Sequence, residues 1–373
     1  MIIAGEVSGD IHGASLIREL KKLDSSLEIF GIGGDLMKDA GMKIIYHINR
    51  MAFLGFVEVI KHIPFIRKVR NDLLEVIKEK NVKSVVLIDY PGFNLSIAKR
   101  VKRLGVKIIY YISPQIWAWG SGRINKIKNL VTKMLVVFPF EENLYKQAGV
   151  DVEFVGHPLP ERIKNYKFLS KDELWDKFGL NKSKEILLIL PGSRNQEVEK
   201  IFPDAIAAAE KLSSKFNLQV VTACSSNIDE KILSKISGST NNKIIKGFTY
   251  DLLKYSKIGI VKSGTSTLEA ALFQLPMVIV YKTNYLTYLI GKNLIKVDNI
   301  GMANIIAGEK VAPELIQNKA DSNSIYYECE KILSDNEIYQ SIKNKLSKVK
   351  DKLGTDGASA RAAKAIYAIL NES

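Results

Sequence analysis

Residues Glu185–Lys200, EILLILPGSRNQEVEK, contain a short apolar run, a Pro-Gly turn and the polar start of a helix. An uninterrupted apolar run such as Ile186–Leu190 is typical of a parallel strand that is covered on both faces of its sheet. Pro191 and Gly192 end the strand, and glycine lets backbone N–H groups approach a ligand closely. The stretch therefore predicts an α/β domain with a ligand-binding turn at the edge of its sheet.

The residues that follow the turn favour an anion. Ser193 can cap the next helix, whose free N–H groups and dipole attract negative charge. Arg194 adds a cation with a fork of N–H donors. These features predict a phosphate site, although an ordinary strand–helix turn with a surface arginine has the same residues.

The composition limits the classes of protein to which this chain can belong. The chain has 373 residues and 46% hydrophobic content, enough for two folded domains. Cys224 and Cys329 are far apart, which favours a reducing compartment and argues against a zinc or disulfide scaffold. We expect no secretory leader and no spanning helix, because no long apolar run occurs. The net charge of +14 fits nucleic acid, an anionic membrane, phosphorylated substrates or a simple solubility bias.

Two stretches of the first half resemble ligand-binding edges of parallel sheets. Residues Ile2–Leu16 form a strand and a glycine-rich turn that lacks the GxGxxG spacing of a dinucleotide site. Ser84–Asn94 is a buried strand that ends in Asp89, at the position of a crevice mouth. Asp89 is a candidate general base, and the alternative is a turn-forming or capping aspartate.

A basic amphipathic segment lies between these two stretches. Apolar residues recur at helical spacing over Met51–Lys80, with Lys and Arg between them. Such a segment can rest on a bilayer interface, and a domain helix with a solvated basic face is the alternative. The apolar residues that we expect at the membrane are Phe56, Val59, Ile60, Ile63 and Ile66.

The second half repeats the α/β pattern and contains a second anion turn. Ser263, Gly264 and Thr265 follow the strand Ile258–Val261 and open a helix. Glu269 in that helix can bind a ribose diol, or it can be a partner of the helix dipole. The sequence has no Asp-x-Asp pair, no metal-binding cluster and no phosphate loop of the ATPase type. We therefore expect a sugar-nucleotide transferase without a metal or other cofactor.

Eight motifs then match one known family in order and at sensible spacing. They are AGEVSGD at 4–10, GIGGDLM at 31–37, IDYPGFN at 88–94, SPQIWAWGSGR at 113–123, VGHPL at 155–159, LPGSRNQEV at 190–198, KSGTSTLEAAL at 262–272 and NIIAGEKVAPELIQ at 304–317. The chain resembles lipid-A-disaccharide synthase from its first residues to GASARAA at 357–363.

The resemblance implies a GT-B fold, in which two Rossmann-like, doubly wound domains face each other across a cleft. The expected parts are an N-terminal acceptor and membrane-facing domain at 1–157, a UDP-sugar domain at 158–345 and returning helices at 346–373. The implied enzyme inverts the anomeric carbon. It moves diacylglucosamine from UDP-2,3-diacylglucosamine to the 6-hydroxyl of 2,3-diacylglucosamine 1-phosphate, giving UDP and the lipid A disaccharide 1-phosphate. The implied location is the cytoplasmic face of the inner membrane of a Gram-negative bacterium, without a nucleic-acid partner.

The resemblance also implies roles for particular residues. Asp89 matches the family's essential aspartate and is the expected base. The expected donor site comprises Gly192, Ser193, Arg194, Glu197, Ser263, Gly264, Thr265, Glu269 and Asn304. The expected acceptor side comprises Glu6, Ser8, Asp10, Trp117 and Arg123. Many relatives carry a second Asp at the position of Gly92, which would then compete with Asp89 as the base. Gly120 stands where an Arg often follows the WAW loop, so phosphate contact would fall to Arg123.

Two alternative readings remain open from the sequence. One is another UDP-sugar enzyme of the same fold, such as a peptidoglycan glucosaminyltransferase or a UDP-sugar epimerase. The WAW and AGEVSGD stretches argue against it. The other is a basic nucleic-acid-binding module, which predicts basic residues interleaved with stacking aromatics or a known binding motif. The sequence shows neither.

Overall fold

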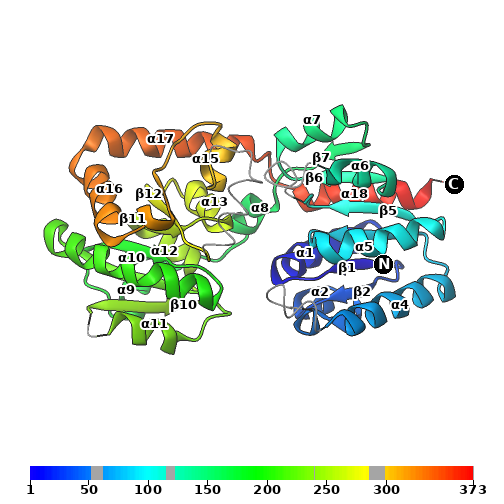
Figure 1. Ribbon diagram of the computed structural model, residues 1–373, viewed down its shortest axis with the longest axis horizontal. Helices are drawn as coiled ribbons and strands as arrows, with labels where there is room; N and C mark the ends of the chain where they lie inside the picture. The colour runs from blue at the N-terminus through cyan, green and yellow to red at the C-terminus, as the bar shows by residue number, and fades with distance from the viewer. Residues whose placement is uncertain (52–61, 115–121, 239, 285–298, 373) are drawn as a thin grey trace. The chain divides into compact units, whose positions relative to one another are not determined.

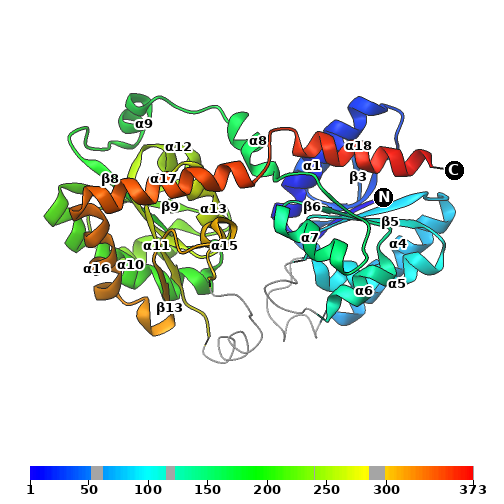
Figure 2. The ribbon, with the colours of Figure 1, turned by 90° about the horizontal axis from the view of Figure 1, so that it is seen from above.

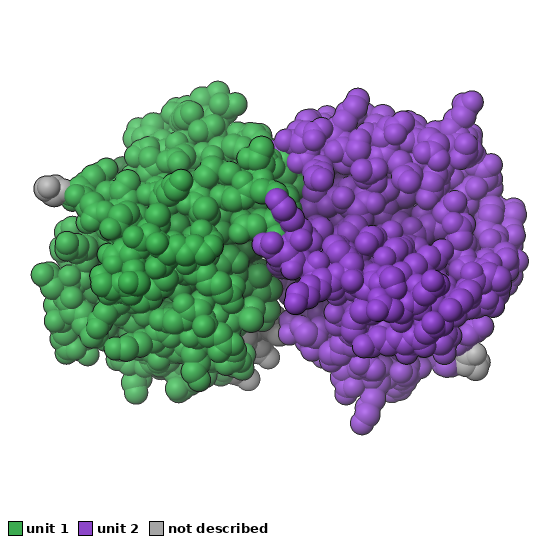
Figure 3. All heavy atoms as spheres, turned by 180° about the vertical axis from the view of Figure 1, so that it is seen from behind, with its two compact units in different colours: residues 1–161, 353–373 green, residues 162–352 purple. Residues whose placement is uncertain are grey.

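The computed structural model describes residues 1–51, 62–114, 122–238, 240–284 and 299–372. The chain divides into two compact units (Figure 3). Unit 1 comprises Met1–Glu161 and Leu353–Ser373, and unit 2 comprises Arg162–Lys352. Four residues with expected roles, Phe56, Val59, Ile60 and Trp117, lie outside the described residues.

Unit 1 is built on a seven-stranded parallel sheet with the order β3-β2-β1-β4-β5-β6-β7 (Figure 1). Its strands are β1 (Ile2–Ala4), β2 (Phe30–Gly33), β3 (Lys43–His47), β4 (Ser84–Ile88), β5 (Lys107–Tyr111), β6 (Lys133–Val136) and β7 (Val152–Phe154). The residues of the inner strands β1, β2 and β4 are all buried and mostly apolar, as expected for a parallel sheet with helices on both faces, whereas the edge strand β3 is half-buried or exposed.

Helices cover both faces of this sheet. Its helices are α1 (Val7–Leu23), α2 (Asp35–Asp39), α4 (Ile63–Glu79), α5 (Pro91–Arg103), α6 (Arg123–Leu130), α7 (Pro139–Gln147) and α18 (Ala358–Asn371), with a 3-10 turn η1 (Ile48–Arg50). Apolar residues of α4, α5 and α6 share one core with alternate strand residues such as Leu87 and Tyr110. Helix α1 packs against Ala4 and Ile88, and α18 packs on α1 (Figure 2).

The C-terminal segment returns to unit 1 at Leu353. Arg361 holds this segment in place, because its guanidinium donates hydrogen bonds to the carbonyl oxygens of Val155 at 2.8 Å, Asp356 at 2.7 Å and Thr355 at 2.8 Å. The expected boundaries at 157 and 346 differ from this division. Helix α17 packs on α13 and α15 and belongs wholly to unit 2, so the crossing segment begins later than expected.

Unit 2 contains a six-stranded parallel sheet with the order β10-β9-β8-β11-β12-β13. Its strands are β8 (Glu185–Leu190), β9 (Leu218–Cys224), β10 (Asn242–Lys246), β11 (Ser256–Lys262), β12 (Met277–Tyr281) and β13 (Glu314–Ile316). The stretch Glu185–Lys200 therefore comprises β8, which lies at the centre of this sheet, the turn after it and the start of α10. Strand β8 pairs with β11, and Leu190 lies opposite Val261.

The helices of unit 2 connect these strands. They are α9 (Lys171–Phe178), α10 (Asn195–Phe216), α11 (Glu230–Ser237), α12 (Thr249–Tyr255), α13 (Thr265–Leu272), α15 (Met302–Ala307), α16 (Ser322–Ser334) and α17 (Asn336–Lys352), with a 3-10 turn η2 (Gln317–Lys319). Helix α8 (Pro158–Lys164) spans the boundary between the units.

The predicted fold class, α/β with two doubly wound parallel sheets, is confirmed. Across the described ranges, no helix combines the length and apolarity that a membrane span requires.

Candidate active site

The turn between β8 and α10 is organised by the carboxylate of Glu197. Gly192 has φ +123°, a conformation that favours glycine, and a Cβ there would lie 2.7 Å from Glu197 Oε2. The backbone N–H of Ser193 donates to the same oxygen at 3.3 Å. The expectation that Ser193 caps the helix is wrong, because Arg194 occupies the N-cap position and no side chain caps the helix.

Glu197 also forms ion pairs with two cations. Its Oε1 lies 3.5 Å from Arg194 Nη1 and 2.8 Å from Lys262 Nζ. Lys262 is the last residue of β11, and its place in the site was not predicted from the sequence. The KSGTS motif contains Lys262, but only the pairing of β8 with β11 shows that this lysine lies at the same sheet edge as Glu197. Two cations share one carboxylate, so the turn keeps one net positive charge.

The second anion turn, between β11 and α13, lies on the strand next to the first. Gly264 has φ +148°, and a Cβ there would lie 3.6 Å from Lys262 Nζ. The hydroxyl of Ser263 donates to the carbonyl of Ile300 at 2.8 Å, and Thr267 donates to the carbonyl of Gly264 at 2.8 Å. Thr265 opens the helix and is exposed. The lysine thus lies beside both turns, as a diphosphate site requires.

Glu269, the candidate ribose ligand, has protein partners on one oxygen. Its Oε1 accepts from Arg162 Nη2 at 3.2 Å and from the hydroxyl of Tyr250 at 3.3 Å. Burial raises the pKa of Glu269, while the charge of Arg162 and the Tyr250 hydrogen bond oppose this shift. Within the described residues its Oε2 has no hydrogen-bond partner, so that oxygen is available to a diol. Arg162 and Tyr250 come from segments distant in sequence from Glu269, and neither was predicted as a site residue.

Asn304 is fully buried and all of its hydrogen bonds are internal. Its Nδ2 donates to the carbonyl of Ala312 at 2.8 Å and to Glu314 Oε1 at 2.7 Å, and its Oδ1 accepts from Val311 and Ala312. Glu314 in turn accepts from the N–H groups of Ile300 and Gly301. The structure therefore corrects the expected ligand contact of Asn304. This side chain holds the segment whose Ile300 carbonyl binds Ser263.

Asp89 lies at the carboxyl end of β4 in unit 1, on a strained backbone. Asp89 and Tyr90 both adopt left-handed conformations, with φ +44° and +47°. Such non-glycine residues each cost about 1–3 kcal/mol and cluster at functional sites. The Asp89 carbonyl accepts from Tyr110 at 2.6 Å and from Asn94 at 2.7 Å, and these bonds hold the turn.

The environment of Asp89 raises its pKa to about 6. Burial is the largest cause, the charge of Glu6 adds to it, and a hydrogen bond from the Tyr90 N–H opposes it. Glu6 follows β1, whose Ala4 pairs with Ile88 of β4, so the two carboxylates lie at neighbouring strand ends. A carboxylate with a pKa near 6 is suited to accept a proton close to neutral pH.

Three other residues expected at the acceptor side, Asp10, Ser8 and Arg123, have different surroundings in the structure. Asp10 is buried, and its carboxylate accepts from the N–H groups of Gly34, Leu36 and Met37 at 2.7–3.2 Å. Asp10 therefore caps the N-terminus of α2, and its expected role at the acceptor side is wrong. Ser8 is exposed in the first turn of α1. Arg123 opens α6, and its positive charge acts on the Tyr110 phenol that binds the Asp89 carbonyl.

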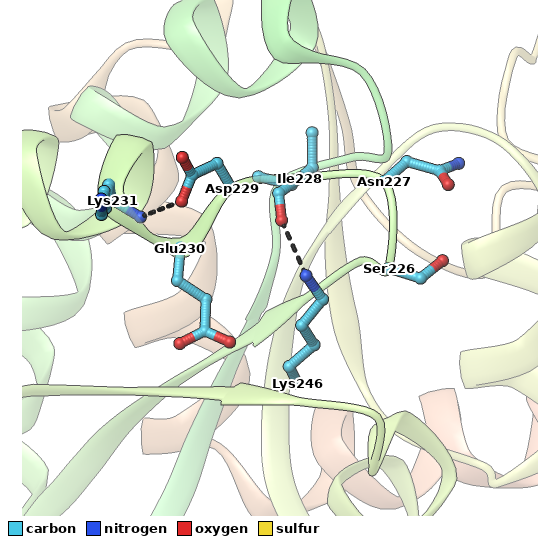
Figure 4. Close-up of a pocket in the computed structure, with 7 residues that line it drawn as sticks. All are labelled: Ser226, Asn227, Ile228, Asp229, Glu230, Lys231 and Lys246. Carbon is cyan, nitrogen blue, oxygen red and sulfur yellow. Dashed lines mark hydrogen bonds between the residues drawn. The ribbon is translucent and has the colours of Figure 1, made fainter.

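A pocket of about 580 Å³ lies at the carboxyl ends of β9 and β10 (Figure 4). Lys246 Nζ donates to the carbonyl of Ile228 at 3.1 Å and fixes the loop that follows β9. Because β9 is the neighbour of β8, this pocket belongs to the same sheet edge as the two anion turns. The remaining lining residues are Ser226, Asn227, Asp229, Glu230 and Lys231.

Two doubly wound parallel sheets with paired anion turns define the GT-B class of nucleotide-sugar enzymes. Solved structures of similar fold include a Staphylococcus aureus MnaA–UDP complex, with TM-score 0.67, 16% identity and coverage of 100% of this chain and 96% of that one. The calicheamicin glycosyltransferase CalG4 matches with TM-score 0.61 and 14% identity over 100% and 97% of the two chains. At such identities the likeness is one of fold.

Sequence comparison identifies the family. The family described as lipid-A-disaccharide synthetase matches residues 1–369. The lipid-A-disaccharide synthase of Geobacter sulfurreducens is 41% identical over 375 residues, covering 100% of this chain and 97% of the relative. That of Coxiella burnetii is 38% identical over 373 residues, covering 99% and 98%. The chain belongs to the lipid-A-disaccharide synthetase family and is a UDP-sugar-dependent glycosyltransferase that forms the lipid A disaccharide.

The raised pKa of Asp89 predicts that Asp89→Asn stabilises the protein. Since the pKa of Asp89 is about 6 in the folded chain and its ordinary value is 3.8, ionisation of Asp89 lowers the free energy of unfolding as pH rises between these values. Above pH ~6.5 the variant should gain about 2–3 kcal/mol over wild type, and below pH ~4 this gain should vanish. Asparagine tolerates the left-handed backbone.

Urea unfolding followed by circular dichroism at several pH values measures this gain. Asp39→Asn, an exposed aspartate on α2, is the matched control and should show no such pH-dependent gain. A gain that stays constant from pH 4 to pH 8 would contradict the raised pKa.

Proposed function

We propose that this glycosyltransferase moves diacylglucosamine from UDP-2,3-diacylglucosamine to the 6-hydroxyl of 2,3-diacylglucosamine 1-phosphate. The products are UDP and the β-linked lipid A disaccharide 1-phosphate. The main support is the family match over residues 1–369, in a chain whose β4 ends in a carboxylate of raised pKa. The direct displacement inverts the anomeric carbon and requires no covalent sugar–enzyme intermediate.

Asp89 is the proposed general base. Its carboxylate takes the proton of the acceptor 6-hydroxyl as that oxygen attacks the anomeric carbon and the bond to the UDP oxygen breaks. The pKa of about 6 leaves Asp89 mostly ionised at neutral pH and still basic enough to assist the transfer. Glu6, Ser8 and Arg123 are the proposed surroundings of the acceptor, together with Trp117.

The leaving UDP is stabilised, in this proposal, by the two turns of unit 2. Arg194 and Lys262 supply the side-chain cations, and Glu197 keeps both in place. The N–H groups of Gly192, Gly264 and Thr265 supply neutral donors near helix starts, where negative charge is favoured, and Ser193 holds the first turn through its N–H bond to Glu197. The free oxygen of Glu269 binds the ribose.

Peripheral contact with the inner leaflet of the membrane is the remaining part of the proposal. Both proposed substrates carry acyl chains, so the acceptor side must reach lipid. Ile63 is 37% exposed at the start of α4, Ile66 is half-buried, and Arg67 and Lys68 beside them are exposed. This pattern of apolar and cationic side chains fits an interface with anionic head groups.

Turnover measurements test the base. UDP release from the two acylated substrates should show kcat/KM that rises with pH through an apparent pKa near 6 and then levels off. Asp89→Ala should reduce kcat by about 100-fold or more. Glu6→Gln should move the rising limb to lower pH, because the Glu6 charge helps to raise the pKa of Asp89.

Asp39→Asn again serves as the control and should keep the wild-type pH profile. Full activity of Asp89→Ala would exclude Asp89 as the base. Absence of UDP release by the wild-type protein would overturn the proposed substrates.

Titration calorimetry with UDP tests the donor site. Arg194→Ala and Lys262→Ala should each weaken UDP binding by about tenfold or more, because charge-assisted hydrogen bonds to phosphate are lost. Lys235→Ala, on the exposed side of α11, makes the same change in net charge and should leave the affinity within about twofold. Equal UDP affinity in all three variants would contradict this assignment.

Vesicle sedimentation tests the membrane contact. Replacement of Phe56, Ile60 and Ile63 together with Ser should release most of the protein from vesicles of phosphatidylcholine and phosphatidylglycerol. The matched control replaces three exposed leucines outside this segment, Leu23, Leu36 and Leu104, with Ser. If the first triple variant binds vesicles as the control does, the segment does not contact the membrane.

A further inference from the structure

A basic pocket of about 270 Å³ lies on the outer side of the helices α4, α5 and α6 of unit 1. These helices are neighbours on one side of the sheet (Figures 1 and 2). Five of the seven lining residues are cations, and none is acidic. The lining residues are Arg70 of α4, Leu95, Ser96, Lys99, Arg100 and Arg103 of α5, and Lys126 of α6.

The spacing along α5 explains why the cations share one surface. Ser96, Lys99, Arg100 and Arg103 follow each other at i, i+3, i+4 and i+7, which places them on one face of the helix. The opposite face, with Ile97 and Val101, is buried in the core of the unit. Like charges at these spacings repel each other, so the stripe opposes the stability of its own helix.

The pocket cations have no acidic partner among the residues that the structure describes. Among the described residues, none of the five takes part in an ion pair within 4 Å. Arg70 Nη1 donates to the hydroxyl of Ser96 at 3.3 Å. Two other guanidinium nitrogens, Arg70 Nε and Arg100 Nη1, are buried and find no acceptor in the described part of the chain. Buried donors of this kind are normally paired, so the pocket is suited to an acceptor with several oxygens.

We propose that this pocket binds the phosphate group of an anionic ligand. Arginine guanidinium groups present forked donors that match phosphate oxygens in pairs, and lysines add point charges around them. Three guanidinium groups from two helices converge here with two ammonium groups, which together exceed the charge of one phosphate. The site is separate from the two anion turns, because those lie in unit 2. A phospholipid head group and a free phosphate ion or ester share this chemistry.

The test compares pocket variants with surface variants of equal charge in the full-length protein. The pocket variant is Arg100→Gln with Arg103→Gln. The control is Lys102→Gln with Lys128→Gln, two exposed lysines on α5 and α6 that do not line the pocket. The soluble probe is inorganic pyrophosphate in titration calorimetry. The membrane probes are phosphatidylcholine vesicles with and without phosphatidylglycerol, in sedimentation.

The pocket variant should lose about tenfold in apparent affinity for a phosphate probe, whereas the control should change by less than about twofold. If the pocket variant loses affinity only for vesicles that contain phosphatidylglycerol, the ligand is a lipid phosphate. If it also loses affinity for pyrophosphate, the phosphate group alone is sufficient for binding. To separate the pocket from the donor site, the calorimetry is repeated in the Arg194→Ala background, where the pocket-dependent loss should persist.

Two results would overturn the proposal. The first is equal affinity of the pocket and control variants for every probe, because the effect would then follow net charge alone. The second is that the wild-type protein binds neither pyrophosphate nor the vesicles that contain phosphatidylglycerol. Misfolding does not explain a loss here, because removal of like charges from α5 should leave the thermal midpoint equal to or above that of wild type.

Discussion

The proposed donor site depends on the contact between Glu197 and two cations from different parts of the chain. Arg194 follows β8 and Lys262 ends β11, and their positive charges would repel each other without the carboxylate between them. Parallel pairing of the two strands puts both cations at the same sheet edge. The Glu197 carboxylate also accepts the Ser193 N–H, so a single side chain fixes the backbone and the charges of the turn.

In unit 1, too, the carboxyl ends of neighbouring parallel strands lie at one sheet edge, but there the side chains brought together repel each other. The ends of β1 and β4 are neighbours, and they bring together Glu6 and Asp89, which have the same charge. Burial of Asp89 and, to a smaller extent, repulsion from Glu6 raise the pKa of Asp89, and the left-handed backbone at residues 89 and 90 adds strain. The Tyr110 and Asn94 hydrogen bonds to the Asp89 carbonyl offset part of that strain. Stability is thus lowered at the carboxylate that we propose as the general base.

The sequence predicted those features that depend on neighbours along the chain. The buried strands, both glycine turns and the strand end at Asp89 follow from local patterns, and they were found. Lys262, Arg162 and Glu314 were missed, because their roles depend on contacts between segments distant in sequence. The error at Asp10 has the same origin: a polar residue beside a glycine turn can face a ligand or cap another helix. Only the position of α2 decides between the two.

The distribution of charge gives the basic composition a physical meaning. In unit 2, site and surface cations repeatedly have acidic partners, as in the pairs Lys282–Asp204, Lys215–Glu330 and Arg162–Glu269. A uniform solubility bias would leave the excess of cations spread over exposed side chains. The stripe on α5 instead concentrates cations around a pocket, where two guanidinium nitrogens are buried and find no acceptor among the described residues. Repulsion within the stripe opposes folding, and an anionic ligand relieves it, which links the excess charge of the chain to a defined place on unit 1.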